Sequence, residues 1–216
     1  MASSSNLVYR SAVWSLVAQL LLGAFTLVGL FVDIPEESRN DLQLIFGLEL
    51  GSQVIELLWY AVVVSRYRKI TTWTRYIDWV FSTPIMLIST LFFFRHRSGD
   101  SLIAVFESEV VYVLLGLNWA MLAFGLLMEL EMVPKGAGLL LGSASFVGSF
   151  TMLATYVDAD DATSIALFGV MYLVWGLYGV AAAFAEEPKN VAYNGLDIVS
   201  KNFYGVFLTV YAFTLV

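Results

Sequence analysis

The chain has 216 residues, of which 59% are hydrophobic and 13% are charged, and its mean hydropathy is +0.79. Water-soluble domains hold about 45–50% apolar and about 25% charged residues, so this composition indicates a membrane protein. The net charge of −7 argues against a basic nucleic-acid-binding face, and the absence of cysteine excludes disulfides and thiolate sites. A spanning helix needs about 20 apolar residues, so the length accommodates seven crossings without room for a soluble domain.

Six polar breaks divide the chain into seven apolar stretches. The breaks lie at 33–40, 65–69, 95–100, 129–135, 158–161 and 186–190. The expected spans are 7–32, 39–65, 71–94, 102–129, 134–157, 162–185 and 191–216. The first span exceeds the apolar core of a cleaved signal peptide, about 7–15 residues, so we expect it to be retained. Short connections favour neighbouring antiparallel helices. We therefore predict an all-α membrane protein, a single domain over 1–216 built as a seven-transmembrane-helix bundle.

Basic residues predict which side of the membrane holds the N-terminus. One side carries Arg10, Arg66, Arg68, Lys69, Lys135 and Lys189, with Arg75 near the same face. The other side carries only Arg39, Arg95 and Arg97. The positive-inside rule, taken alone, places the N-terminus in the cytoplasm.

The last span contains a lysine near its middle. A charge at that depth costs about 2.5–3.5 kcal/mol on insertion scales, so it marks a functional site by default. Asp197 lies one turn before Lys201 on the same helical face, and Asn194 lies nearly one turn before Asp197. A buried Lys–Asp pair that only satisfies itself is the structural alternative.

The third and sixth spans carry two further motifs. In TRYIDWVFSTPIMLIST, the polar residues Arg75, Asp78, Ser82 and Ser89 form one helical stripe. Pro84 predicts a kink, with the hydroxyls of Ser82 and Thr83 available to the backbone groups that it frees. In the sixth span, Trp175 and Tyr178 share one face, a spacing that by itself is typical of ordinary core packing.

Together these motifs, RYxDWxFxTP, WxxY and a lysine four residues after an aspartate, resemble the microbial rhodopsins. The resemblance implies a retinal, all-trans in the dark, bound covalently to Lys201 as a protonated Schiff base. It implies that Asp78 and Asp197 are the counterions, because a nearby opposite charge favours the charged form, and that Arg75 balances the second carboxylate. The retinal pocket that it implies also includes Trp79, Ser82, Thr83, Met86, Trp175 and Tyr178.

The second span is unusually polar, with one stripe of Glu49, Ser52, Gln53, Glu56 and Tyr60. Two carboxylates facing lipid or dry protein would cost about 5–7 kcal/mol. One interpretation is that both glutamates are protonated and hydrogen-bonded within the bundle. The other is a hydrated cation path with acidic selectivity groups.

A glutamate in the second span, a serine in the first and an asparagine directly after the retinal lysine resemble the central gate of channelrhodopsins. Glu56, Asn202 and either Ser11 or Ser15 match this pattern. The chain most resembles the channel-forming viral rhodopsins of large algal viruses, which implies light-gated conduction of small cations or protons. The expected ion path consists of Ser11, Ser15, Glu49, Gln53, Glu56, Asn194 and Asn202. The resemblance implies an N-terminus outside the cell, and we expect this orientation although the count of basic residues favours the opposite one.

Three positions depart from the family pattern. Ser89 stands where pumps commonly have a proton-donor carboxylate, Ser82 stands where threonine is usual, and Gly179 stands where proline often follows the tyrosine. The missing donor weakens the alternative of a light-driven outward proton pump. A sensory photoreceptor is a third alternative, for which the sequence contains no transducer domain.

The remaining polar groups indicate no catalytic or metal site. We expect His96 in a solvated turn between Arg95 and Arg97, and Asp158, Asp160 and Asp161 in a solvated acidic turn without a calcium motif. No Ser/His/Asp set or glycine-rich phosphate loop is present, so we expect no enzyme. The sequence leaves open whether the chain is monomeric or a homo-oligomer in the lipid bilayer.

Overall fold

The computed structural model describes residues 4–65 and 71–216. Six helices make one crossing each: α1 (Ser4–Gly29), α2 (Glu36–Ser65), α3 (Arg75–Ser98), α4 (Glu109–Glu129), α5 (Lys135–Ala154) and α6 (Ala162–Ala182). The seventh crossing consists of α7 (Glu186–Asp197), the π-helical turn η3 (Ile198–Asn202) and α8 (Phe203–Phe213). Short 3-10 helices, η1 (Thr72–Thr74) and η2 (Ile103–Glu107), precede α3 and α4. The predicted all-α seven-helix bundle is confirmed.

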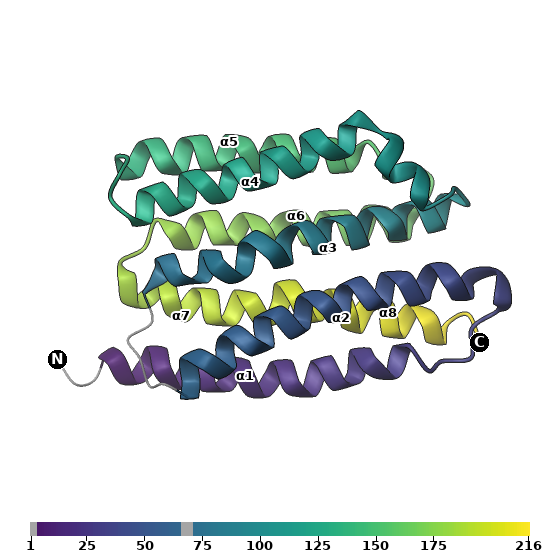
Figure 1. Cartoon of the computed structure of the whole chain (residues 1–216), viewed down its shortest axis with the longest axis horizontal. Coiled ribbons are helices and arrows are strands. Elements are labelled where there is room, and N and C mark those ends of the chain that lie inside the picture. The colour runs from purple at the N-terminus through teal and green to yellow at the C-terminus, as the bar shows by residue number, and fades with distance from the viewer. Residues whose placement is uncertain (1–3, 66–70) are drawn as a thin grey trace.

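The helices run up and down, and the two chain ends lie at opposite ends of the bundle (Figure 1). We refer to these as the N-terminal end, where α1 begins, and the C-terminal end, where α8 ends. The α4–α5 pair lies on one side, and α1 packs against α2, α7 and α8 on the other. The seventh crossing is therefore adjacent to the two helices that carry the predicted ion path.

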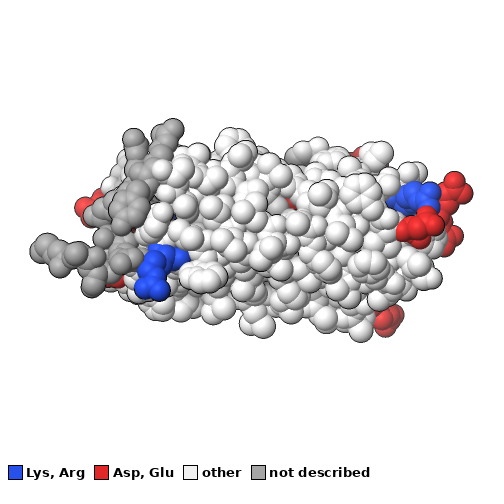
Figure 2. Space-filling view, turned by 90° about the horizontal axis from the view of Figure 1, so that it is seen from below, with Lys and Arg blue, Asp and Glu red and all other residues white. Residues whose placement is uncertain are grey.

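The outer surface suits a lipid environment. Among the described residues, six helices are individually long and apolar enough to cross a membrane, and the segmented, more polar α7–α8 stretch completes the set. Large apolar side chains such as Trp14 and Leu140 are 69% and 70% exposed. In the view of Figure 2, Lys, Arg, Asp and Glu gather at the two ends. The chain is an integral multi-pass membrane protein whose sides contact lipid.

The predicted break at 95–100 starts too early, because α3 continues through Ser98 and only Gly99 and Asp100 lie beyond the helix. Gly99 then takes a left-handed conformation with φ of 73°, which ends the helix. His96 lies in the last turn of α3, where a basic group suits the helix dipole. Its Nδ1 is 3.1 Å from Asp41 Oδ2, and its side chain is only 10% exposed, so the predicted solvated turn is also wrong.

The predicted break at 186–190 is helical as well. Pro188 lies in the first turn of α7, where its missing N–H removes no helical hydrogen bond. Lys189 is therefore not a loop cation: its Nζ donates to Glu129 Oε2 at 2.6 Å, with both side chains less than a tenth exposed. Three other residues of the charge count, Arg66, Arg68 and Lys69, lie outside the described residues.

Two further boundaries differ from the expectation. The fourth crossing begins at Glu109 and not at residue 102, because the preceding segment folds as η2. The acidic turn before α6 is not merely solvated. Asp161 accepts hydrogen bonds from the backbone N–H groups of Thr163 and Ser164, and its carboxylate pairs with Arg97 at 2.7 Å. It therefore caps α6 and joins that helix to α3.

Pro84 lies inside α3, as the sequence predicted. A side chain of the neighbouring helix α4 hydrogen-bonds to the backbone carbonyl that the proline leaves without a donor. Proline has no N–H for the carbonyl four residues earlier, which belongs to Val80. Trp119 of α4 donates its Nε1–H to that carbonyl at 3.2 Å. Thr83 Oγ1 donates to the Trp79 carbonyl at 2.8 Å and accepts from Asn118 Nδ2 at 2.9 Å. These bonds join α3 to α4 beside the predicted retinal pocket.

Candidate functional site: a buried lysine, its carboxylates and an apolar cavity

Lys201 lies at the centre of a group of buried charges. It belongs to η3, and its side chain is 2% exposed. Its Nζ donates to Asp78 Oδ2 at 2.5 Å, and Glu56 Oε1 lies 3.6 Å from the same nitrogen. Asp78 comes from the first turn of α3 and Glu56 from α2. One buried cation thus faces two buried carboxylates on two helices.

Asp197 belongs to a different set of contacts, although it is one turn from Lys201. Its Oδ2 accepts from Arg75 NH1 at 2.9 Å and from the Tyr60 hydroxyl at 2.7 Å, and its Oδ1 accepts from Tyr178 at 2.7 Å. Within the described residues, Asp197 forms its ion pair with Arg75 and not with Lys201. The sequence grouped Asp78 with Asp197, whereas the second carboxylate near Nζ is Glu56.

Arg75 extends these contacts towards the N-terminal end. Its side chain donates to Asn194 Oδ1 at 2.5 Å and to Asn190 Oδ1 at 3.1 Å, and Asn194 Nδ2 donates to Ser11 Oγ at 2.8 Å. We call this set the arginine network. Its members are Ser11, Tyr60, Arg75, Tyr178, Asn190, Asn194 and Asp197. It joins five of the crossings through α1, α2, α3, α6 and α7.

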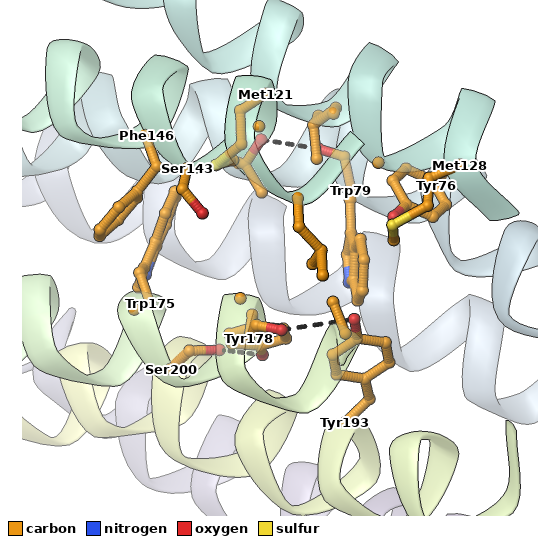
Figure 3. Close-up of a pocket in the computed structure, with 18 of the residues that line it drawn as sticks. Tyr76, Trp79, Met121, Met128, Ser143, Phe146, Trp175, Tyr178, Tyr193 and Ser200 are labelled. Carbon is orange, nitrogen blue, oxygen red and sulfur yellow. Dashed lines mark hydrogen bonds between the residues drawn. The ribbon is translucent and has the colours of Figure 1, made fainter. Parts of the chain in front are cut away.

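An apolar cavity of about 300 Å³ lies beside Lys201. Six of the predicted retinal-site residues line it: Trp79, Thr83, Met86, Trp175, Tyr178 and Lys201. Figure 3 shows Trp79, Trp175 and Tyr178 pointing into this region from α3 and α6. Ser82, also predicted to lie there, is fully buried on α3 but does not line the cavity.

The far wall of the cavity comes from α4 and α5, which the sequence did not predict. Met121 and Gly125 of α4 line it, together with Gly142 and Phe146 of α5. A Cβ added at Gly125 would clash with the Tyr76 hydroxyl, so glycine here lets Tyr76 pack against α4. A buried amine with a carboxylate behind it, at the side of an apolar cavity, suits a long apolar aldehyde. The residues present therefore fit retinal.

The polar stripe of α2 faces the bundle interior. Glu49, Ser52 and Glu56 are each 0% exposed, and Gln53 is 6% exposed. Glu49 Oε2 and both oxygens of Glu56 have no hydrogen-bond partner among the described residues, although Glu56 Oε1 lies within ion-pair distance of Lys201. Buried carboxylate oxygens are normally satisfied by protein or water. Buried carboxylate oxygens without a hydrogen-bond partner among the described residues therefore lie on both sides of Gln53 along the stripe.

Gln53 connects this stripe with the turn that carries Lys201. Its Nε2 lies 3.1 Å from Glu49 Oε1, 3.3 Å from Thr26 Oγ1 and 3.4 Å from the Lys201 carbonyl oxygen. Gly205 of α8 packs directly against the Gln53 amide and Thr26. Three helices, α1, α2 and α8, therefore meet at one amide group.

Among the described residues, the predicted gate residues do not hydrogen-bond to one another. Ser11 is part of the arginine network, and Ser15 is fully buried and accepts from Gln19 Nε2 at 2.9 Å. Asn202 is also fully buried, and its amide has no partner among the described residues. Within that part of the chain, neither serine has a hydrogen bond to Glu56.

Two members of the arginine network were missing from the sequence prediction for different reasons. Tyr60 lies on the same stripe as Glu49 and Glu56, so its spacing was a usable signal for a polar role. Asn190 had no such signal, because the sequence placed it in a loop. Tyr178 was expected only against the polyene, but its hydroxyl also lies 2.7 Å from Asp197 Oδ1 and from Ser200 Oγ.

Comparisons with known proteins identify the fold. A family model described as bacteriorhodopsin-like protein matches residues 10–215. The solved structure of the viral rhodopsin OLPVRII is 28% identical, with a TM-score of 0.86, and the alignment covers 97% of this chain and 99% of that chain. No curated protein matches.

More distant structures share the fold. A blue light-absorbing proteorhodopsin from Med12 is 18% identical with a TM-score of 0.74, covering 96% of each chain. The bromide-bound halorhodopsin of Halobacterium salinarum is 18% identical with a TM-score of 0.72, covering 97% of this chain and 95% of that chain. Family membership implies retinal bound to a lysine. This chain belongs to the bacteriorhodopsin-like family, the microbial rhodopsins.

Proposed function

We propose that this chain is a light-gated cation channel that holds retinal on Lys201, with residues 1–216 acting as one retinal-binding unit. When bound there, retinal would supply light absorption and a change of shape that moves the lysine nitrogen. Trp79, Met86, Trp175 and Tyr178 would hold its apolar chain, because they line the cavity next to Lys201. The dark isomer would be all-trans, as the family resemblance implies.

Asp78 would stabilise a positive charge at Nζ, since its Oδ2 is 2.5 Å away. It would also be the nearest acceptor for the Nζ proton. Asp197 would act through the electrostatic field of the site, because its own charge is compensated by Arg75 and two hydroxyl groups. The arginine network would thus set the electrostatic field around Lys201, while Asp78 would accept the proton from the lysine nitrogen.

One observation carries the channel proposal: Glu56 belongs to both the charge centre and the polar stripe. Its Oε1 is 3.6 Å from Lys201 Nζ, and the stripe continues from it through Gln53 to Glu49. A loss of charge at Nζ would leave the Glu56 carboxylate without its ion-pair partner. Hydration by water and cations then becomes favourable along α2, because an unpaired buried carboxylate is costly.

The other predicted path residues would continue this route. Asn194 and Ser11 would line its N-terminal half as members of the arginine network. Ser15, Gln53 and Asn202 would surround its middle, where Asn202 offers unpartnered buried polar atoms. The ions conducted would be small cations or protons, because the charged groups of the stripe are carboxylates.

A light-driven outward proton pump is the second candidate. The direct bond between Lys201 and Asp78, with Arg75 and Asp197 nearby, favours it. Against it, Ser89 occupies the expected donor position, and its carbonyl accepts from the Tyr204 hydroxyl at 3.0 Å. A hydroxyl group does not release a proton near neutral pH as a carboxyl group can.

We propose that the N-terminus lies outside the cell. The basic excess that argued otherwise is reduced by Lys189, whose charge is paired with Glu129, and by Arg75, which is paired with Asp197. Paired, buried charges are poor topological signals compared with exposed loop cations. A tag at the N-terminus that is accessible only after permeabilisation would contradict this orientation.

Voltage-clamp recording under illumination in defined ions tests the channel. The expected photocurrent reverses near the equilibrium potential of the permeant cation, whereas a pump gives outward current at all voltages. Glu56→Gln should change conductance or selectivity with little effect on visible absorbance, because Asp78 still faces Nζ. Lys201→Ala is the control and should abolish absorbance and current together. Unchanged currents in Glu56→Gln would contradict the proposed path.

A further inference from the structure

The polar stripe of α2 stops abruptly towards the C-terminal end. Glu49 is its last polar member, and the positions before it on the inward face are Phe46, Ile45 and Leu42. All three are 0% exposed. The inward face of α2 thus changes from a carboxylate to an aromatic ring within one helical turn. None of these side chains reaches the surface.

Residues of two neighbouring helices lie beside Phe46 at the same level of the bundle. On α1, Thr26 contacts Gln53, and Gly29 follows one turn later. On α8, Gly205 packs against Gln53, and Thr209 follows one turn later. Gly29, Phe46 and Thr209 then meet each other, because a Cβ added to Gly29 would strike the Phe46 ring and approach Thr209 Oγ1.

One hydroxyl group lies at this meeting point. Thr209 Oγ1 donates to the Gly205 carbonyl at 2.9 Å, so its proton is already used within its own helix. The absence of a side chain at Gly29 lets the tip of the Phe46 ring rest on the α1 backbone. The ring therefore fills the junction of α1, α2 and α8.

Beyond Phe46 lies an apolar layer that reaches the C-terminal end. Phe93, Leu91 and Leu208 are each 0% exposed and belong to one apolar cluster with Phe46. Apolar constrictions in channels stop ions by excluding water, because a cation cannot shed its hydration shell there. The hydroxyls buried beside this layer donate to backbone carbonyls: Ser89 Oγ to Ile45 at 3.3 Å and Thr90 Oγ1 to Met86 at 2.8 Å.

Resting on the proposed cation path, we propose that the Phe46 ring, seated on Gly29 beside Thr209, is the hydrophobic gate that closes the C-terminal half of the path. The juxtaposition of three helices at this ring means that conduction requires α1, α2 and α8 to separate there. The link to the charge centre is covalent, since η3, which carries Lys201, continues directly into α8. Movement of the lysine turn would shift Thr209 relative to Phe46.

Phe46→Ala and Phe46→Gln test the gate by voltage clamp of the full chain in darkness and light. Alanine removes the ring, and glutamine keeps much of its length while adding hydrogen-bonding groups. Both should raise the dark cation conductance severalfold and slow the decay of photocurrent after illumination. Phe46→Leu, which keeps the site apolar, should stay close to the wild type in darkness.

Leu153→Ala is the matched control. Leu153 is 0% exposed and lies near the C-terminal end, but on α5, which packs against α4 and α6. It should create a cavity without dark conductance. Visible absorbance in every variant verifies that the pigment has folded, and if the alanine variant does not fold, the glutamine variant decides.

The outcomes separate the two proposals. Wild-type dark conductance and decay in both Phe46→Ala and Phe46→Gln would overturn the gate while leaving the channel intact. Dark conductance in Leu153→Ala equal to that of Phe46→Ala would also overturn it, because any cavity would then suffice. A wild-type current that never reverses would contradict the channel proposal itself, independently of the Phe46 variants.

Discussion

The two ends of the bundle are packed by different interactions. The N-terminal end contains the arginine network, in which one guanidinium joins a carboxylate and two asparagines from neighbouring turns. The C-terminal end contains the apolar cluster around Phe46, Phe93 and Leu208. Hydrogen-bonded groups can exchange protein partners for water at modest net cost, about 0.5–1.5 kcal/mol per bond. Exposing one large apolar side chain costs about 1.5–3 kcal/mol, with no new bond in return.

Because of this difference, one light-driven movement would act differently on the two ends. Water entering the polar end replaces existing bonds, so that end can rearrange gradually. Water entering the apolar end must first open a space between packed side chains, so that end should behave as an all-or-none barrier. The predictions below test this contrast by measuring what each end contributes to stability.

The largest effect is expected from Arg75→Met. The change leaves the Asp197 carboxylate buried and without its ion-pair partner, which typically costs about 3–5 kcal/mol. Denaturant or thermal loss of visible absorbance in detergent measures it. Arg39→Met is the matched control, because the Arg39–Asp33 pair is exposed and worth about 0–1 kcal/mol. Equal losses in both variants would show that burial does not distinguish these two pairs.

A smaller effect is expected from Tyr60→Phe at the same end. The variant keeps the ring but removes the hydroxyl that donates to Asp197 Oδ2 at 2.7 Å. A hydrogen bond to a charged group contributes about 1.5–3 kcal/mol. The same unfolding assay measures the loss, and Arg75 still compensates the carboxylate. A loss as large as that of Arg75→Met would contradict the view that Arg75 supplies the main compensation.

The smallest effect is expected from Asp161→Asn at the C-terminal end. Hydrogen bonds from Arg97 hold the pKa of Asp161 below its usual range. A lowered folded-state pKa stabilises the fold above the ordinary carboxyl pKa of about 3.9, and this contribution is lost as the pH falls towards the folded-state value. At neutral pH the variant should lose no more than about 1 kcal/mol, since the pair is near the surface.

The difference in unfolding free energy between the variant and the wild type should become smaller below about pH 4, because protonation of the wild-type carboxylate then removes its stabilising contribution. Unfolding at neutral and acidic pH measures the difference. Asp160→Asn removes the same charge from the same turn and serves as the control. A deficit that grows on acidification would reverse the expected sign and contradict the Arg97–Asp161 assignment.

The sequence predicted the crossings and the residues of α3, α6 and η3 beside the cavity for a clear physical reason. Apolar runs near the length of a bilayer can hardly fold otherwise, and the buried lysine, aspartates and tryptophans stand out because charge and bulk are rare or conspicuous in such runs. Its boundaries were less reliable. Residues 95–98 and 186–190 are charged yet helical, since charge at a helix end is compatible with both water and the helix dipole.

Helical periodicity is a local property, so it was enough to predict the spanning helices and the stripe of Glu49, Gln53 and Glu56. Which carboxylate faces the Lys201 nitrogen depends instead on how the helices pack. Asp197 is one turn from Lys201 in sequence, but Arg75 and two tyrosines hold it, so Glu56 from α2 lies within 3.6 Å instead. The contact between Phe46 and Gly29 could likewise not be predicted from the sequence. Contacts between helices depend on their relative rotation and shift, which the sequence of a single helix does not determine.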